Sequence, residues 1–342
     1  MYFIFSTKLS QIQTDQVQAL YADIEFSSIE QFPGFADAAY PNEKIIHALM
    51  FVNNSLTGYS QIRIKKRLFA SVYFGPLVKN EQEYLDFVKR IKNYCRNNWT
   101  PILKIFPPEY TGKYKTSFWN KLKNNTHFET SENEFNWATL LLKIGLSDDI
   151  IFKKIADNHQ QSIKKAIKLG LTTTVLDVKD LTLFNKQYCE MYASRKLNID
   201  SELNLKKFTQ LFHFFKNNNN GFFMGVWLNN QLIGGTCIAF ENNVAFYLEG
   251  YSNPEYRKLP IGHIALYESM KIARNNGLNY FDFGGYALNT KEGDQLQKIN
   301  KFKEGFRGEL ITYPKTMTFY TFFPAKWLWK LYQKSSKFKV QS

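Results

Sequence analysis

The stretch Tyr280–Gly308 reads YFDFGGYALNTKEGDQLQKINKFKEGFRG, and its pattern indicates the fold class. A short apolar strand ends in the double glycine Gly284-Gly285, and a polar loop then leads into a basic helix that contains Lys303. Glycines at the end of a strand leave room for a ligand that enters between splayed strands. A lysine brought back over them stabilises the charge that develops during transfer of an activated carboxyl group. The stretch therefore predicts a transferase site.

An internal repeat extends this pattern to most of the chain. Residues 51–58 and 227–234 each form an apolar strand, an Asn-Asn turn and a second strand, at an offset of about 176 residues. A strand, a helix and another strand follow in both halves. We expect these elements at Leu68–Phe74, Glu81–Asn98 and Ile102–Phe106 in the first half, and at Val244–Tyr251, Gly262–Asn276 and Tyr280–Phe283 in the second.

The order hairpin, strand, helix and strand resembles the core of GNAT acyltransferases. The sequence thus predicts an α/β protein with mixed sheets, built from two GNAT-like units in tandem. We place the first unit at 1–130, completed by 310–342, and the second unit, which carries the transferase site, at 131–309. We expect the second unit to open with a strand over Ala138–Leu146 and a single helix from Asp148 to Leu169.

Composition limits the class of partner. The chain has 342 residues, of which 44% are hydrophobic and 17% aromatic, enough for a substantial core. Its net charge of +14 favours an anionic partner, such as a phosphorylated donor, an RNA or an acidic membrane surface. A solvated face rich in lysine explains the same charge equally well.

Cysteine usage and hydropathy predict the compartment. The three cysteines are far apart and form neither a disulfide framework nor a metal-binding spacing, so we expect a reducing cytoplasm and no metal. The apolar start of the chain is too short for a signal peptide, and no apolar run is long enough to span a membrane.

The loop after the strand Val244–Tyr251 is a candidate donor site. It is rich in turn residues and basic, and it opens a helix whose free N–H groups favour anions. Arg257 and Lys258 supply charge, and Gly262 permits close approach of a phosphate or carboxylate. An ordinary strand-to-helix connection is the alternative.

The other candidates surround Lys303, which we expect to be the catalytic cation. Phe302 would anchor the helix while Lys303 points outward. A base for the incoming amine is less obvious, and we consider Glu249, Asp282 and Tyr247, although Asp282 more simply satisfies nearby backbone donors. The predicted substrate-binding set is completed by Gly284, Gly285, Tyr286, Lys301 and Phe302.

Several segments resemble the Fem family of peptidyl-bridge enzymes. They are SIEQFPGFAD at 28–37, FGPLV at 74–78, SIKKA with Gly170 at 162–170, NPEYR at 253–257, and Phe302-Lys303 with Gly305-Phe306. The resemblance implies a tandem GNAT-like aminoacyltransferase of cell-wall biogenesis. Such an enzyme takes an amino acid from aminoacyl-tRNA, without a tightly bound cofactor, and attaches it to an amine of a peptidoglycan precursor.

Two further functions stay open. The first is a GNAT N-acyltransferase that uses acyl-CoA on a lipid or sugar amine, although the chain lacks a clean pyrophosphate-loop pattern. The second is an inactive double-GNAT module that binds RNA or an anionic membrane. The basic, tryptophan-rich segment 326–334 suits a peripheral contact with the inner face of the membrane, or a final helix that packs on the first unit.

Overall fold

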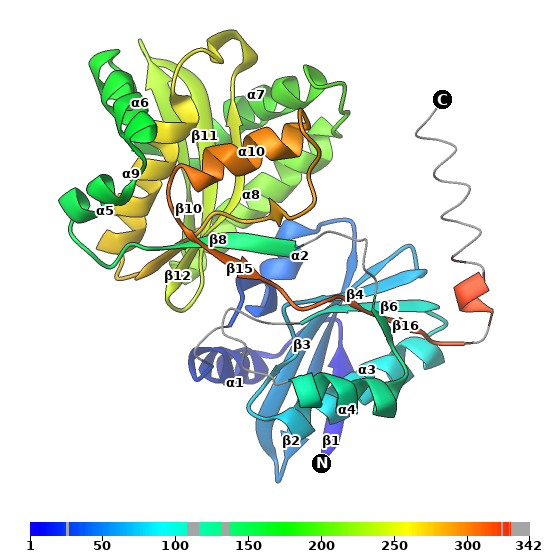
Figure 1. The fold of residues 1–342 in the computed structure, drawn as a ribbon. Coiled ribbons are helices and arrows are strands. Elements are labelled where there is room, and N and C mark those ends of the chain that lie inside the picture. The colour runs from blue at the N-terminus through cyan, green and yellow to red at the C-terminus, as the bar shows by residue number, and fades with distance from the viewer. Residues whose placement is uncertain (25–26, 108–115, 131–136, 323, 328, 330–342) are drawn as a thin grey trace. The chain divides into compact units, whose positions relative to one another are not determined.

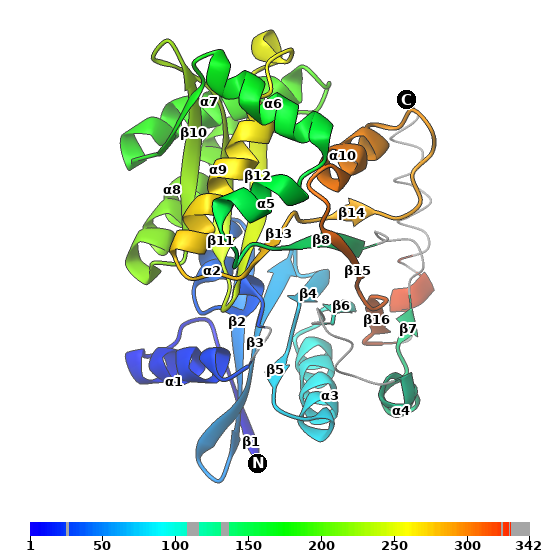
Figure 2. The ribbon, with the colours of Figure 1, turned by 60° about the vertical axis from the view of Figure 1, so that its left-hand side comes forward.

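The computed structural model describes residues 1–24, 27–107, 116–130, 137–322, 324–327 and 329. The chain forms two compact units (Figures 1 and 2). Unit 1 comprises Met1–Ala36, Asn42–Glu134 and Pro314–Ser342, and unit 2 comprises Asp37–Pro41 and Phe135–Tyr313. Within the described residues each unit contains an eight-stranded mixed sheet, which confirms the predicted α/β class.

The sheet of unit 1 has the order β1-β2-β3-β4-β6-β16-β7, with β5 paired to β3. Helix α3 lies on this sheet, because Tyr84, Phe87 and Ile91 recur at helical spacing and are fully buried. The strands are β1 (Tyr2–Ser6), β2 (Lys44–Val52), β3 (Ser55–Lys65), β4 (Phe69–Tyr73), β5 (Leu77–Val78), β6 (Ile102–Phe106), β7 (Glu129–Thr130) and β16 (Met317–Tyr320). The helices in this part of the chain are α1 (Gln11–Ala22), η1 (Ile29–Gln31), α2 (Phe35–Ala39), α3 (Glu81–Asn97) and α4 (Thr116–Thr126).

The sheet of unit 2 has the order β14-β8-β13-β12-β11-β10-β9, with β15 paired to β8. Its strands are β8 (Trp137–Lys143), β9 (Thr172–Val175), β10 (Gly221–Leu228), β11 (Gln231–Phe240), β12 (Val244–Ser252), β13 (Tyr280–Asp282), β14 (Tyr286–Ala287) and β15 (Glu309–Thr312). The helices are α5 (Asp148–Lys154), α6 (Asp157–Lys168), η2 (Val178–Asp180), α7 (Leu181–Ala193), α8 (Ser201–Asn218), η3 (Pro254–Tyr256), α9 (Ile261–Asn275) and α10 (Gln295–Glu304).

Alternating side chains of β10 face two different layers of helices. Met224 and Val226 belong to the core that α9 and α6 cover. Phe223 points to the opposite face, where its ring meets Phe184 of α7 and Phe208 of α8. Because successive side chains of a strand point to opposite faces, this strand is apolar on both faces.

The predicted hairpins are confirmed in both units. Asn53-Asn54 adopt φ angles of 50° and 62°, and Asn229-Asn230 adopt 49° and 62°. Each hairpin also has a register shift at the same place before its turn, between Met50 and Phe51 and between Val226 and Trp227. The internal repeat therefore includes the register shifts of the two hairpins.

The predicted single helix over Asp148–Leu169 is wrong. The chain forms α5 and α6 instead, with an extended residue, Ile155, between them (φ −65°, ψ 144°). Ile155 is fully buried, and the next amide, that of Ala156, donates to the carbonyl of Gly305 at 2.9 Å. The break thus joins the start of α6 to the residue that follows α10.

Three further features concern membranes and metals. No helix in the described part of the chain is long and apolar enough to cross a bilayer. Across the same residues, His, Cys, Asp and Glu form no group of three that would hold a metal ion. Most of the predicted amphipathic segment 326–334 lies outside the described residues, which include only Lys326, Trp327 and Trp329 of it.

Candidate active site

Two parallel strands part in the middle of the unit 2 sheet. β12 and β13 pair only over Val244–Phe246 and Tyr280–Asp282. β13 then ends, whereas β12 continues along β11 to Ser252, with a register shift opposite Cys237 and Ile238. Such a shift bends a strand and increases its twist. The sheet is therefore open beyond Asp282, where the double glycine follows.

A cavity of about 320 Å³ lies where the strands part. Its walls come from α7, β11, β12, the first turns of α9, and α10. The lining residues that concern the chemistry are Tyr247, Gly250, Gly262, His263, Phe302 and Lys303. The structure thus brings together three residues of the predicted site, namely Gly262, Phe302 and Lys303.

Lys303 lies over the double glycine, and it does not point outward as the sequence predicted. The residue is only 7% exposed, and its Nζ donates to the carbonyls of Gly284 at 3.2 Å and Gly285 at 2.7 Å. Asn300 and Lys303, three residues apart, form the buried face of α10. Burial lowers the pKa of Lys303 to about 8, and the negative charge of Asp282 opposes that shift.

Asp282 is fully buried and accepts hydrogen bonds within its own surroundings. Its Oδ1 accepts from the amide of Gly284 at 2.6 Å and from the hydroxyl of Thr139. Its Oδ2 accepts from the hydroxyl of Tyr313 at 3.4 Å. These contacts agree with the predicted structural role of Asp282, since its carboxylate satisfies nearby donors. The same contacts fix the turn over which Lys303 lies.

The two glycines of the turn serve different purposes. Gly284 has a φ of +67°, and a Cβ there would lie 2.8 Å from the carbonyl oxygen of Tyr247. A side chain is therefore disfavoured both by the backbone angle and by the neighbouring strand. A Cβ on Gly285 would meet open space. Gly285 is thus the position where the structure leaves room beside Lys303.

A histidine that the sequence analysis missed supports α10 from behind. The Nε2 of His159, on α6, is hydrogen-bonded to the carbonyl of Phe302 at 2.8 Å. Its ring occupies the place of a side chain at Gly305, where a Cβ would lie 2.1 Å from it. His263 packs against the same ring, with centroids 4.5 Å apart. Burial lowers the pKa of both histidines, that of His263 to about 4, so both rings are neutral at pH 7.

The remaining predicted binding residues lie outside the lining of this cavity. Arg257 and Lys258 are exposed on the loop before α9, and Lys301 is exposed on α10. The hydroxyl of Tyr286 donates to the carboxylate of Glu304 at 2.5 Å. Gly262, by contrast, lines the cavity. A Cβ there would lie 3.1 Å from the ring of Phe302, so this glycine makes room for that ring.

Comparison with known proteins agrees with this geometry. Residues 153–295 match the model of the acetyltransferase (GNAT) domain. This match lies within unit 2. The structure of FemX superposes with a TM-score of 0.79 at 14% identity, over 97% of this chain and 99% of that one. A tandem GNAT protein from the clavulanic acid biosynthesis pathway gives 0.61 at 10% identity, over 94% and 99%. The predicted tandem GNAT fold is therefore confirmed.

Shorter segments are similar in sequence to curated enzymes. A stretch of 75 residues is 32% identical to a lipid II:glycine glycyltransferase of Staphylococcus haemolyticus, and covers 22% of this chain and 18% of that enzyme. A stretch of 53 residues is 38% identical to the enzyme of the same name from Staphylococcus epidermidis, over 16% and 13%. The matched segments thus span less than a fifth of these relatives, and the predicted resemblance to Fem proteins is confirmed for the fold and for these segments.

Glu249, on β12, is held by two partners that the sequence did not indicate. Its Oε1 forms an ion pair with the Nζ of Lys207, on α8, at 2.5 Å. Its Oε2 accepts from the hydroxyl of Tyr188, on α7, whose pKa is raised by burial and by this carboxylate. Tyr247 and Gly250, on the same strand, line the cavity, whereas Glu249 is outside its lining. Its role as a base stays a prediction.

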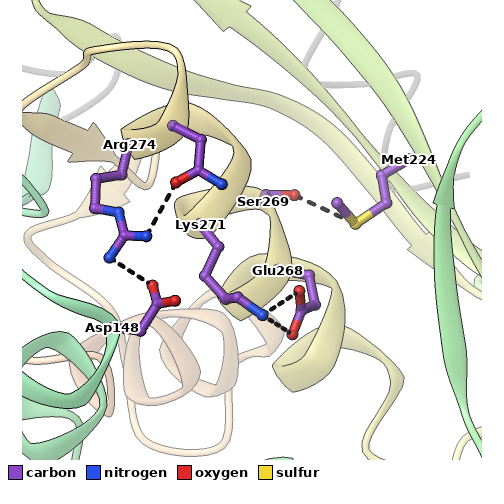
Figure 3. Close-up of polar contacts among 7 residues, drawn as sticks. Asp148, Met224, Glu268, Ser269, Lys271 and Arg274 are labelled. Atoms are coloured by element: carbon purple, nitrogen blue, oxygen red, sulfur yellow. Dashed lines mark hydrogen bonds and ion pairs between the residues drawn. The ribbon is translucent and has the colours of Figure 1, made fainter.

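Contacts along α9 fix the helix that forms one wall of the cavity (Figure 3). Arg274 forms an ion pair with Asp148 of α5 at 2.8 Å. The hydroxyl of Ser269 donates to the sulfur of Met224 on β10 at 3.7 Å, and Lys271 pairs with Glu268 one turn away. The far part of α9 is thus attached to α5 and β10, which sets the direction of its first turn.

Proposed function

We propose that the chain is an N-acyltransferase that forms an amide bond on an amine of a peptidoglycan-type precursor, with an aminoacyl group as the transferred group. The observation that carries this proposal is the buried Lys303, held over the double glycine at the opening of the sheet. The GNAT domain and the segments similar to lipid II:glycine glycyltransferases support it.

The proposed reaction is attack of the acceptor nitrogen on the ester carbonyl of the donor. A C–N bond forms, the ester C–O bond breaks, and the leaving hydroxyl takes up a proton while the amine loses one. An ammonium group has three N–H donors. Within the described residues, two of those on Lys303 go to Gly284 and Gly285, and the third is available to the oxyanion. A donor aimed at charge that exists only in the transition state lowers the barrier.

For the donor, we propose aminoacyl-tRNA. The net charge of +14 suits a polyanion, and the loop at 253–262 lacks a clean pyrophosphate-binding pattern for coenzyme A. The alternative is an acyl-CoA donor with a lipid or sugar amine as acceptor, which the match to an acetyltransferase domain favours. Glu249 and Asp282 are the proposed candidates for the base, and Arg257, Lys258 and Lys301 for contacts with the donor.

We also propose that the enzyme works in the cytoplasm on a precursor at the inner face of the membrane. This location provides charged tRNA on one side and a lipid-linked amine on the other. Segment 326–334 is basic and rich in tryptophan, a composition that suits a peripheral contact of this kind.

The test is a transfer assay with the purified full chain and lipid II as acceptor. One reaction contains tRNA charged with labelled amino acids, and the other contains acetyl-CoA. Mass spectrometry of the acceptor reads the added group. We expect an amide-linked amino acid only with charged tRNA. Acetylation instead would establish the alternative, and salt-dependent RNA binding without transfer to any amine acceptor would indicate an inactive module.

A further inference from the structure

At one end of the unit 1 sheet, the ends of β3, β4, β6 and β16 lie next to one another (Figure 1). Lys65, the last residue of β3, pairs with Phe69, which pairs with Ile102, which in turn pairs with Tyr320. The turn at 66–68, the residues before β6 and those after β16 therefore lie side by side. The hydroxyl of Thr321 also donates to the carbonyl of Thr100 at 2.8 Å. We call this end of the sheet the tryptophan edge.

Large apolar side chains protrude from the tryptophan edge. Trp99 is 80% exposed, Trp327 is 63% exposed and Leu68 is 47% exposed. Phe322 lies beside Trp99, with ring centroids 6.1 Å apart. Single exposed apolar residues are common on soluble proteins, but two tryptophans and a leucine on adjoining turns form a patch, and such patches mark contact surfaces.

The backbone of Trp99 strengthens this interpretation. Trp99 follows the C-cap residue Asn98 of α3 and has a φ of +53°, in the left-handed region that helix ends usually fill with glycine. An indole there strains the backbone and is not buried in the core. Because neither the turn nor the core requires this side chain, its exposure points to a partner outside the chain.

The basic side chains of the tryptophan edge favour an anionic partner. The side chains of Lys65, Lys66, Arg67 and Arg96 are all exposed around the apolar group. Lys104 lies over the ring of Trp329, with Nζ 4.9 Å from its centroid. Glu129 on β7 forms an ion pair with Lys326. Among the described residues, the four exposed basic side chains thus give this edge a positive charge.

We propose that the tryptophan edge docks unit 1 on an anionic phospholipid bilayer. Trp99, Trp327 and Leu68 would enter the headgroup region, where indole rings are favoured, and the basic side chains would contact lipid phosphates. A lipid surface fits better than RNA because Leu68 is aliphatic and offers no ring on which a base stacks. The inference goes beyond the proposed transfer reaction, since binding to a bilayer requires neither Lys303 nor a donor.

The experiment is co-sedimentation of the full chain with vesicles. One set contains phosphatidylcholine alone, and the other contains equimolar phosphatidylcholine and phosphatidylglycerol. We expect binding to the anionic vesicles only. Charge reversal in the double variant Lys66→Glu and Arg67→Glu should weaken that binding by at least about tenfold, since each basic residue near the surface contributes about 1 kcal/mol. Trp99→Gly should weaken it several-fold while the melting temperature stays equal or rises.

The matched controls are Ile12→Ala, an exposed apolar residue on α1 of the same unit, and Lys216→Glu, an exposed charge on α8. Both should bind vesicles like the unchanged protein. The proposal is overturned if the full chain does not sediment with anionic vesicles, or if Trp99→Gly and Ile12→Ala bind equally well. Loss of binding to a mixed-sequence RNA in Trp99→Gly, with vesicle binding unchanged, would assign the surface to RNA instead.

Discussion

The two units place the same elements in the same order, but their parallel strands meet in different ways. In unit 1, β4 and β6 pair over five residues, from Phe69–Tyr73 to Ile102–Phe106, along the full length of both strands. In unit 2, the corresponding β12 and β13 pair over three residues and then part. Only the second arrangement opens the sheet within the described residues, and the cavity with Lys303 lies at that opening.

Unit 1 also has an interruption in its sheet, which one of its own side chains fills. The ladder on β3 is interrupted between β4 and β5, and Gln31 from η1 bridges the interruption. Its Oε1 accepts from the amide of Gln61 at 2.9 Å, and its Nε2 donates to the carbonyl of Tyr73 at 2.6 Å. A repeated fold thus gives one unit closed by a glutamine and one unit left open beneath a lysine.

The largest expected effect is a loss of transfer when the lysine of the open unit, unit 2, is removed. Lys303→Ala should lower the rate of transfer by about 10²- to 10³-fold, because it removes a preorganised donor from the transition state. The fold should stay intact, since the loss of a buried charge also removes its desolvation cost. The rate is measured with the assay described above, and circular dichroism checks the fold. Lys298→Ala, on the same helix and exposed, is the matched control and should keep near-normal transfer.

Dependence on pH separates a cationic role of Lys303 from a structural one. With a pKa of about 8, the ammonium group deprotonates as the pH rises above that value, so transfer should decline there. In Lys303→Arg the guanidinium stays charged, and any residual transfer should lose this decline. A pH profile that is the same in the unchanged protein and in Lys303→Arg would contradict the cationic role of Lys303.

The next effect is a loss of stability when the glutamine that closes unit 1 is replaced. Gln31→Leu should lower the free energy of unfolding by about 2–5 kcal/mol, because the buried amide of Gln61 and the carbonyl of Tyr73 each lose a partner. Denaturant unfolding measures this loss. Gln11→Leu, an exposed glutamine on α1, should change the stability by no more than about 0.5 kcal/mol. Equal stability of the two variants would show that Gln31 does not close unit 1.

A smaller effect distinguishes the two glycines of the open unit. Gly284→Ala should cost about 1–3 kcal/mol of stability, because its backbone is left-handed and the Tyr247 carbonyl is close. Gly285→Ala should fold normally and yet transfer more slowly, because its methyl group enters open space beside Lys303. Thermal unfolding and initial rates, compared between the two variants, test this division. A stable and fully active Gly285→Ala would show that substrate does not use that space.

The smallest effect concerns the histidines behind α10. The pKa of His263 is about 4 in the folded protein and near 6.5 when unfolded, so the unfolded chain binds more protons between these values. The free energy of unfolding should therefore fall as the pH drops from 6.5 towards 4. His263→Leu should reduce that fall, whereas His213→Leu, at an exposed position on α8, should leave it unchanged. Unfolding curves across this range provide the measurement.

Much of the fold follows from local sequence signals. The Asn-Asn turns, the strand and helix periodicities and the order of elements depend on residues close together in the chain, and the structure confirms them in both units. The position of Lys303 over the double glycine also follows, since the strand, the loop and α10 are consecutive. Local propensity did not show the break at Ile155, because a hydrogen bond between Ala156 and Gly305 accompanies it.

The environment of the site was decided by tertiary structure alone. Burial of Lys303, the contact of His159 with Phe302 and the ion pair of Glu249 with Lys207 each join segments far apart in the sequence. No pattern in one segment encodes which distant side chain will face it. By itself the sequence determined two similar units and named the lysine of the second. Packing decided that this lysine is buried with a lowered pKa, because only the assembled sheet removes it from water.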